Sequence, residues 1–121
     1  MTIYQPKRTA AAILGALAVV GSGVGPARAQ SPEEVRGIIA DRAAAHGQSI
    51  PYLTRVAECE SRLDIRAIGQ RGEQGLYQLL PGGELTRFYS YGYDDPWSAW
   101  QQADFTARRF SEGGARAWSC A

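Results

Sequence analysis

The sequence is poor in histidine and cysteine, with one and two residues respectively. Its one histidine, His46, stands at the end of a predicted helix, and no cysteine pair lies near it in the chain. Metal sites combine several such ligands, so the sequence predicts no metal and no cofactor. Ser61 has no His–Asp pair in its neighbourhood, which argues against a catalytic serine nucleophile.

The sequence contains only one lysine, Lys7, which lies near the start of the chain. Residues 30–121 contain ten arginines and twelve acidic residues, which gives this part a net charge of −2. A nucleic-acid partner normally requires a basic patch, and attraction to a membrane surface requires a polybasic segment. Neither partner is therefore predicted.

No apolar run is long enough to span a bilayer comfortably. The longest, residues 10–20, follows two basic residues and precedes a glycine-rich stretch that ends in Ala27-Arg28-Ala29. This order is typical of a secretory signal peptide cleaved after Ala29, and it fits a membrane anchor less well. We predict a signal peptide over residues 1–29 and one exported domain, periplasmic or secreted, over residues 30–121.

Cysteine is scarce as well, with only Cys59 and Cys120. In an exported protein of this size, an even number of cysteines usually forms disulfides. We therefore expect these two residues to be paired rather than to remain free thiols. The bond would close a loop of about sixty residues, which the chain-entropy model values at roughly 4 kcal/mol.

Apolar–polar alternation never continues beyond a few residues, so the sequence predicts no regular strand. Capping residues and helical spacing instead predict helices over residues 31–46, 49–61, 84–91 and 96–113, the last opened by Pro96. Residues 64–80 are predicted to form a loop and a short apolar turn, and Trp118 and Cys120 an anchored tail. The predicted fold is all-α.

Glu60 is the candidate for chemistry on the second of these helices. Successive helical residues rotate by about 100 degrees, so Leu53, Val56, Ala57 and Glu60 share one otherwise apolar face, whereas Glu58 falls on the opposite side beside two arginines. Desolvation raises the pKa of a carboxyl, and a raised pKa suits a general acid at neutral pH. Periodicity alone leaves open a structural role as a helix-end glutamate paired with an arginine.

Residues 60–81 resemble the soluble lytic transglycosylase family. That family has a Glu-Ser pair at a helix end, matched by Glu60-Ser61, then a Gly-x-x-Gly-Leu-Met-Gln segment and a proline. The counterpart here is Gly72-Glu73-Gln74-Gly75-Leu76-Tyr77-Gln78, followed by Pro81. Cys59-Glu60-Ser61 and Trp118-Ser119-Cys120 are also similar to segments of the resuscitation-promoting factors.

The resemblance implies a small, single-domain helical member of the α+β lysozyme-like superfamily, with one disulfide and a substrate groove beside the end of helix 51–61. It also implies a substrate, the glycan strands of peptidoglycan, and leaves cell-envelope protein partners unidentified. In the family, one glutamate protonates the β-1,4 glycosidic oxygen between N-acetylmuramic acid and N-acetylglucosamine. The same residue then deprotonates the C6 hydroxyl, which closes a 1,6-anhydro ring. The resemblance assigns this role to Glu60.

Further substrate contacts are expected from Gln78, which matches a residue that lines the family's site, and from Ser61 beside the catalytic position. Tyr77 replaces the family's Met and could pack against a sugar ring. Gly69 stands where the family often has a serine, and Glu73 replaces a small residue.

Glu73 has two interpretations. It could be a second carboxylate that orients water, which would make the protein a lysozyme-type muramidase, or a loop residue paired with Arg71 or Arg66. Among the aromatic side chains, Tyr93 is a candidate sugar contact, whereas Trp97 and Trp100 are predicted to be structural. Outside catalysis, the alternative is a peptidoglycan-binding protein that cleaves nothing.

Overall fold

The structure is a computed structural model, and it describes residues 30–121. Within this range it contains helices α1 (Pro32–Ala45), α2 (Ile50–Ser61), α3 (Glu84–Ser90) and α4 (Ala99–Ser111), and the 3-10 helix η1 (Ala115–Ala117). No named strand occurs in the described part of the chain, so the predicted all-α class is confirmed. The predicted signal peptide lies outside the described residues. None of the helices in residues 30–121 is long and apolar enough to cross a membrane.

The helices begin where side chains can satisfy their first backbone N–H groups. Ser31 and Glu34 form a reciprocal capping box at α1, and the Ser49 hydroxyl accepts a hydrogen bond from Tyr52 N–H at α2. Both starts confirm the sequence prediction. The prediction for α4 was three residues early, because Pro96 belongs to the turn before the helix and Ser98 is the cap.

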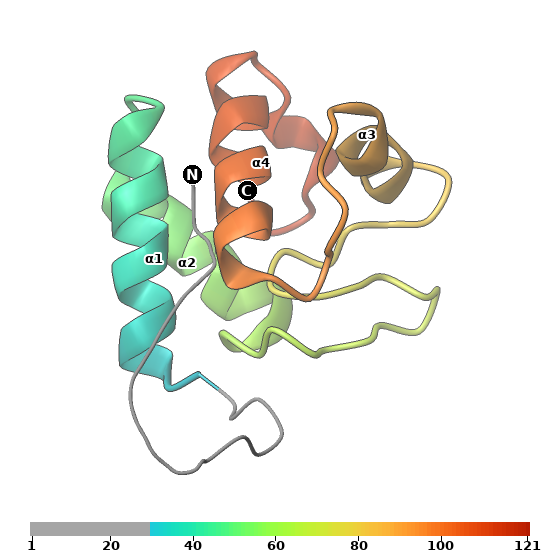
Figure 1. Ribbon diagram of the computed structural model, residues 1–121, viewed down its shortest axis with the longest axis horizontal. Coiled ribbons are helices and arrows are strands. Elements are labelled where there is room, and N and C mark those ends of the chain that lie inside the picture. Colours follow the sequence, from blue (N-terminus) through green and yellow to red (C-terminus); the bar gives the residue numbers. More distant parts are fainter. Residues whose placement is uncertain (1–29) are drawn as a thin grey trace, which may run out of the picture.

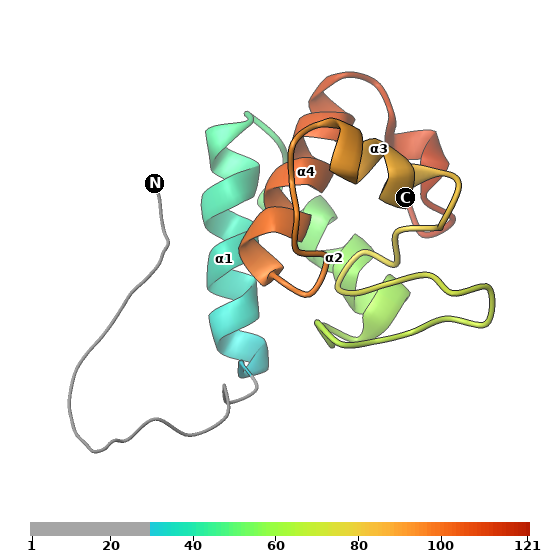
Figure 2. The same ribbon diagram turned by 45° about the vertical axis from the view of Figure 1, so that its right-hand side comes forward.

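Helix α1 packs against both α4 and α2, and the three form the compact half of the molecule in Figures 1 and 2. Helix α3 and the long loop of residues 62–83 lie on the other side of α4. Phe105 of α4 is fully buried at the centre, and its ring contacts four other aromatic rings. Those rings belong to Phe88, Tyr91, Tyr93 and Trp118.

A partly buried polar cluster joins α1 to α4. The Asp104 carboxylate accepts hydrogen bonds from Arg42 Nη1 at 3.0 Å and from Tyr93 Oη at 2.6 Å, and it lies 2.8 Å from His46 Nε2. The lone histidine is therefore part of a helix-to-helix contact.

The C-terminal tail folds back onto the centre of the domain. Trp118 is 4 % exposed, and its indole Nε1–H donates to Tyr77 O at 2.9 Å. Cys120 forms a disulfide with Cys59, with an S–S distance of 2.04 Å. The predicted disulfide and anchored tail are both confirmed, and such a bond is compatible with an oxidising compartment.

Candidate functional site

Glu60 lies in the last turn of α2, above the buried side chains of Leu53, Val56 and Ala57. It is partly buried, whereas Glu58 is exposed and pairs with Arg36 of α1 at 3.3 Å. The predicted difference between the two carboxylates is therefore present. The partner of Glu58 is thus an arginine of a different helix, rather than Arg55 or Arg62, which are its neighbours in the sequence.

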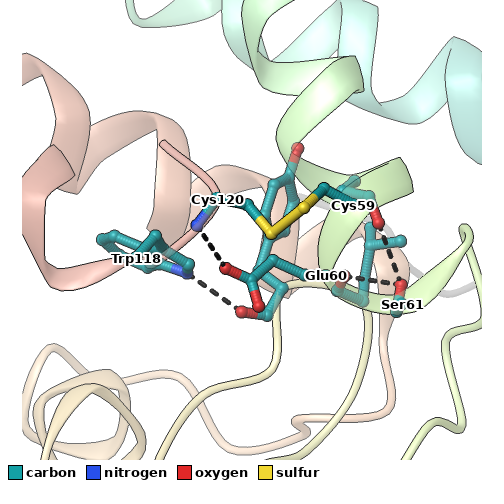
Figure 3. Close-up of a disulfide and its surroundings, with 8 residues drawn as sticks. Cys59, Glu60, Ser61, Trp118 and Cys120 are labelled. Carbon is teal, nitrogen blue, oxygen red and sulfur yellow. Dashed lines mark hydrogen bonds between the residues drawn. A yellow bond between two sulfur atoms is a disulfide. The ribbon is translucent and has the colours of Figure 1, made fainter.

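The Glu60 carboxylate faces the C-terminal tail (Figure 3). Its Oε2 accepts a hydrogen bond from the backbone N–H of Cys120 at 3.2 Å. The neighbouring Ser119 side chain also acts on this carboxyl, and its effect is to lower the pKa. Within residues 30–121, no arginine forms an ion pair with Glu60. The alternative of a helix-end ion pair therefore has no support from the structure.

Burial raises the pKa of Glu60 above its ordinary value, and the negative charge of Glu73 raises it further. The hydrogen bonds from Cys120 and Ser119 act in the opposite direction because they favour the carboxylate, but burial has the larger effect. The consequence is a carboxyl that holds its proton to higher pH than a solvated glutamate, as a proton donor must.

The chain turns sharply after Glu60 because two non-glycine residues adopt left-handed backbone conformations. Arg62 and Leu63 have φ values of 56° and 63°, and the turn buries the Leu63 side chain in the core. The Ser61 hydroxyl donates to Leu76 O at 2.7 Å, which fastens the helix end to the loop. The hydroxyl of Ser61, a predicted substrate contact, is therefore engaged in a hydrogen bond within the protein, and the residue is partly buried.

The loop opposite Glu60 is held by Gln102, a fully buried residue of α4 that the sequence analysis did not single out. Its Oε1 accepts from Tyr77 N–H at 2.7 Å, and its Nε2 donates to Gln74 O at 2.8 Å and to Pro96 O at 2.7 Å. The sequence did contain one indication of this role. Gln102 is an amide at an inward position of the predicted helix 96–113, and a buried polar group needs hydrogen-bond partners.

Gly75 allows this close contact between the loop and α4. Its φ is +81°, and a Cβ here would collide with the Gln102 amide and lie 2.6 Å from Pro96 O. Pro96 O is a backbone atom, so it cannot move away from an added Cβ as the end of a flexible side chain could. The glycine of the family-like motif therefore has a physical reason in this structure.

Gln78, Glu73 and Gly69 form one cluster on the loop. Gln78 Nε2 donates to Ala67 O at 3.1 Å and to Gly75 O at 3.0 Å, which turns its Oε1 toward Gly69. A Cβ at position 69 would lie 2.5 Å from Glu73 Oε1 and 2.6 Å from Gln78 Oε1. Glu73 thus occupies space that a side chain at position 69 would need, so these two departures from the family pattern are spatially coupled.

The Glu73 carboxylate is fixed by its own loop. Its Oε1 accepts from Arg71 N–H at 2.8 Å, and its Oε2 lies 3.9 Å from Arg71 Nε. Backbone hydrogen bonds, from its own N–H and from that of Arg71, lower the pKa of Glu73, so it is ionised at neutral pH. The predicted pairing with Arg71 is present, and in addition the charge of Glu73 acts on Glu60.

The prediction for Tyr77 needs correction. Tyr77 is 0 % exposed and donates its hydroxyl to Leu53 O at 2.8 Å, so its ring cannot contact a sugar. Its ring packs in the core together with the buried side chains of Leu76 and Leu79. Tyr93 stays a predicted sugar contact. It is partly buried, its ring stacks on Phe88 at 5.0 Å between centroids, and its hydroxyl donates to Asp104 at 2.6 Å.

Trp97 also differs from its prediction as a structural residue, because it is 37 % exposed. Together with Arg66 and Ile68 it lines an open hollow of about 330 Å³. Trp100 is partly buried beneath the Arg42 guanidinium, 4.7 Å from its ring centroid, as a structural tryptophan would be. Because α4 begins only at Ala99, Trp97 lies in the turn before the helix, and its side chain does not pack into the core.

In residues 30–121 no group of histidine, cysteine, aspartate and glutamate side chains is arranged to hold a metal ion. Comparison of the chain with models of protein families, with curated proteins and with solved structures finds no match.

Proposed function

We propose that the protein is a peptidoglycan lytic transglycosylase that cleaves the β-1,4 bond between N-acetylmuramic acid and N-acetylglucosamine. The observation that carries the proposal is the environment of Glu60, a partly buried carboxyl at a helix end with a raised pKa and no arginine partner in the described part of the chain. The family-like motif around it supports the choice of substrate.

In the proposed reaction, Glu60 first donates its proton to the glycosidic oxygen. The bond from C1 to that oxygen breaks, and N-acetylglucosamine leaves with a free 4-hydroxyl. The Glu60 carboxylate then removes the proton of the C6 hydroxyl while O6 bonds to C1. This closes the 1,6-anhydro ring and returns Glu60 to its protonated form without a water molecule.

Glu73 supports a second candidate function, a muramidase that hydrolyses the same bond. Glycosidases that use water commonly combine a protonated and an ionised carboxyl whose environments push their pKa values apart. Glu60 has a raised pKa and Glu73 a lowered one, and the two are close enough to interact electrostatically. In this alternative Glu73 would orient or activate a water molecule that attacks C1.

Mass spectrometry of the soluble products from purified sacculi distinguishes the candidates. We expect 1,6-anhydro-muropeptides from the wild-type protein, none from Glu60→Gln, and substantial product from Glu73→Gln. Reducing-end muropeptides, lost equally in Glu60→Gln and Glu73→Gln, would establish the muramidase instead. Binding to sacculi by wild type and Glu60→Gln alike, with no product from either while a control enzyme is active, would identify a binding protein and refute both enzymes.

A further inference from the structure

The C-terminal tail reaches the carboxyl on which the proposed reaction depends. Cys120 is tethered to Cys59, the residue next to Glu60 in the chain, and its own N–H donates to Glu60 Oε2 at 3.2 Å. The covalent bond and the hydrogen bond therefore connect the same two segments, 61 positions apart in sequence. Figure 3 shows the disulfide and the Cys120 N–H converging on the end of α2.

The tail is well anchored before it reaches Glu60. Trp118 is buried, its Nε1–H donates to Tyr77 O, and its ring lies 5.2 Å from that of Phe110 between centroids. A backbone hydrogen bond from Ala121 N–H to Trp118 O closes a tight turn around Ser119 and Cys120 at 3.2 Å. The turn places the Cys120 N–H on the Glu60 carboxyl and brings the Ser119 side chain close enough to act on it.

We propose that residues 118–120 form a positioning clamp for Glu60, in which Cys120 N–H and the Ser119 hydroxyl orient the carboxyl and the Cys59–Cys120 disulfide holds them in place. The inference rests on the proposed function in assigning Glu60 as the acid. Ser119 and Cys120 are positioning residues, since their contacts are with Glu60.

The hydrogen-bond chemistry gives the clamp a specific effect. A protonated carboxyl has one hydroxyl oxygen that donates and one carbonyl oxygen that accepts. Because Oε2 accepts from Cys120 N–H, the proton is directed to Oε1, which leaves that oxygen as the donor toward a ligand. Orientation of this kind matters because small misplacements of a reacting group are costly to the rate.

The clamp influences the Glu60 pKa in two opposing ways. The covering tail contributes to the burial that raises the pKa, whereas the two donated hydrogen bonds lower it. Among the described residues, Glu73 is the charged group that acts on Glu60, and it belongs to the loop rather than to the tail. Removing a donor and releasing the tail should therefore move the pKa in opposite directions.

The first arm of the test changes Ser119 and leaves the disulfide intact. The Glu60 pKa is measured by carbon-13 NMR titration of the side-chain carboxyl, without substrate, and the basic limb of the pH–activity profile is measured in parallel. We expect Ser119→Ala to raise the Glu60 pKa and shift that limb to higher pH. Ser119→Thr should restore wild-type values, and Ser111→Ala, a serine at the end of α4, serves as the unchanged control.

The second arm releases the tail by Cys59→Ser/Cys120→Ser, or by a dithiol that supplies two electrons and two protons to the disulfide and is itself oxidised to a cyclic disulfide. We expect the Glu60 pKa to fall toward its ordinary value of 4.5, since burial is the largest cause of its rise. Activity should fall about 10- to 100-fold at a temperature where circular dichroism shows native helix content.

An unchanged Glu60 pKa in both Ser119→Ala and the tail-released protein would overturn the clamp. If release of the tail unfolds the chain, Ser119→Ala and Ser119→Thr still decide the question, because both retain the disulfide. Failure of the proposed function has a different outcome. If the variants show the expected changes in the Glu60 pKa but the wild-type protein cleaves no glycan, the clamp is supported and the proposed reaction is refuted.

Discussion

Glu58 and Glu60 are two residues apart on the same helix, yet their side chains meet different surroundings. Helical rotation places one beside Arg36 at the surface and the other against the disulfide-linked tail. Periodicity predicted this difference correctly, because it depends only on which face of α2 is apolar. The hydrogen bonds on Glu60 could not be predicted in this way, since their donors lie sixty positions away in sequence.

Glu60→Gln should reduce glycan cleavage by about 10²- to 10⁴-fold, the usual contribution of a general acid, whereas Glu58→Gln should leave it near wild type. Product release from sacculi measures both. Comparable losses in the two variants would contradict the assignment of Glu60 as the acid, because Glu58 has the same chemistry in a solvated position.

Glu60→Gln also has a predicted effect on the stability of the fold. The folded-state pKa of Glu60 is raised, so its proton favours folding at low pH, and that contribution is lost as the pH rises from the ordinary 4.5 through the raised value. At pH 7, Glu60→Gln should therefore unfold at an equal or higher temperature than wild type. Thermal unfolding measured at pH 4 and pH 7 checks the sign, and a variant less stable than wild type only at pH 7 would contradict it.

Gly69 offers a second test at the residue scale. A Cβ at this position overlaps Glu73 Oε1 and Gln78 Oε1, so Gly69→Ala should lower the free energy of unfolding by about 1–3 kcal/mol. Glu73→Ala in the same chain should recover part of that loss, because it removes one of the two overlapping side chains and leaves Gln78 in place. A double-mutant cycle by urea unfolding measures the coupling, and strictly additive effects would show that the two positions are independent.

At the scale of elements, α1 and α4 are joined through Asp104. Burial by itself would raise the pKa of Asp104, but hydrogen bonds from Tyr93, His46 and Arg42 outweigh it, so the pKa lies below its ordinary 3.8. The resulting stabilisation is present above pH 3.8 and is lost as the pH falls through the lowered value. This cluster therefore makes the packing of the two helices sensitive to acid.

Asp104→Asn should lower the free energy of unfolding by about 1–3 kcal/mol at pH 7, because part-buried donors lose a charged acceptor. Asp41→Asn is the matched control, since Asp41 also bonds Arg42, at 2.8 Å, but its side chain is 63 % exposed. The control should change stability by less than about 1 kcal/mol. Urea unfolding at pH 7 and in acid measures both, and equal losses in the two variants would contradict the role of burial.

The elements also show where local sequence information ends. Ser31, Ser49 and Ser98 all cap helices through a nearby backbone N–H, an interaction decided within three residues of the cap. Pro96 is compatible with a first helical turn, but its carbonyl is bound by Gln102, and this contact keeps it in the preceding turn. Trp97 is exposed for the same reason, so one missed start produced two wrong predictions.

At the scale of the whole molecule, the site is assembled from α2, the loop of residues 66–78 and the tail. The motif in the sequence marked the first two, because their residues are contiguous in the chain. It misassigned Tyr77, because a motif records which residues occur together and not which way they face. Burial of Tyr77 and the bond from Ser61 to Leu76 O follow from packing across the entire domain.

The Cys59–Cys120 disulfide is expected to contribute a large part of the free energy of unfolding of this domain. Closing a loop of this length contributes about 4 kcal/mol on the chain-entropy model. Domains of this size change their midpoint of thermal unfolding by about 4–8 °C for each kcal/mol, so Cys59→Ser/Cys120→Ser should unfold about 15–30 °C lower than the oxidised wild type. Dithiol-treated wild type is the control and should agree with the double variant, because both lack the same cross-link. Midpoints within a few degrees of each other for oxidised and reduced protein would contradict the prediction, since the tail would then be held by Trp118 and its neighbours alone.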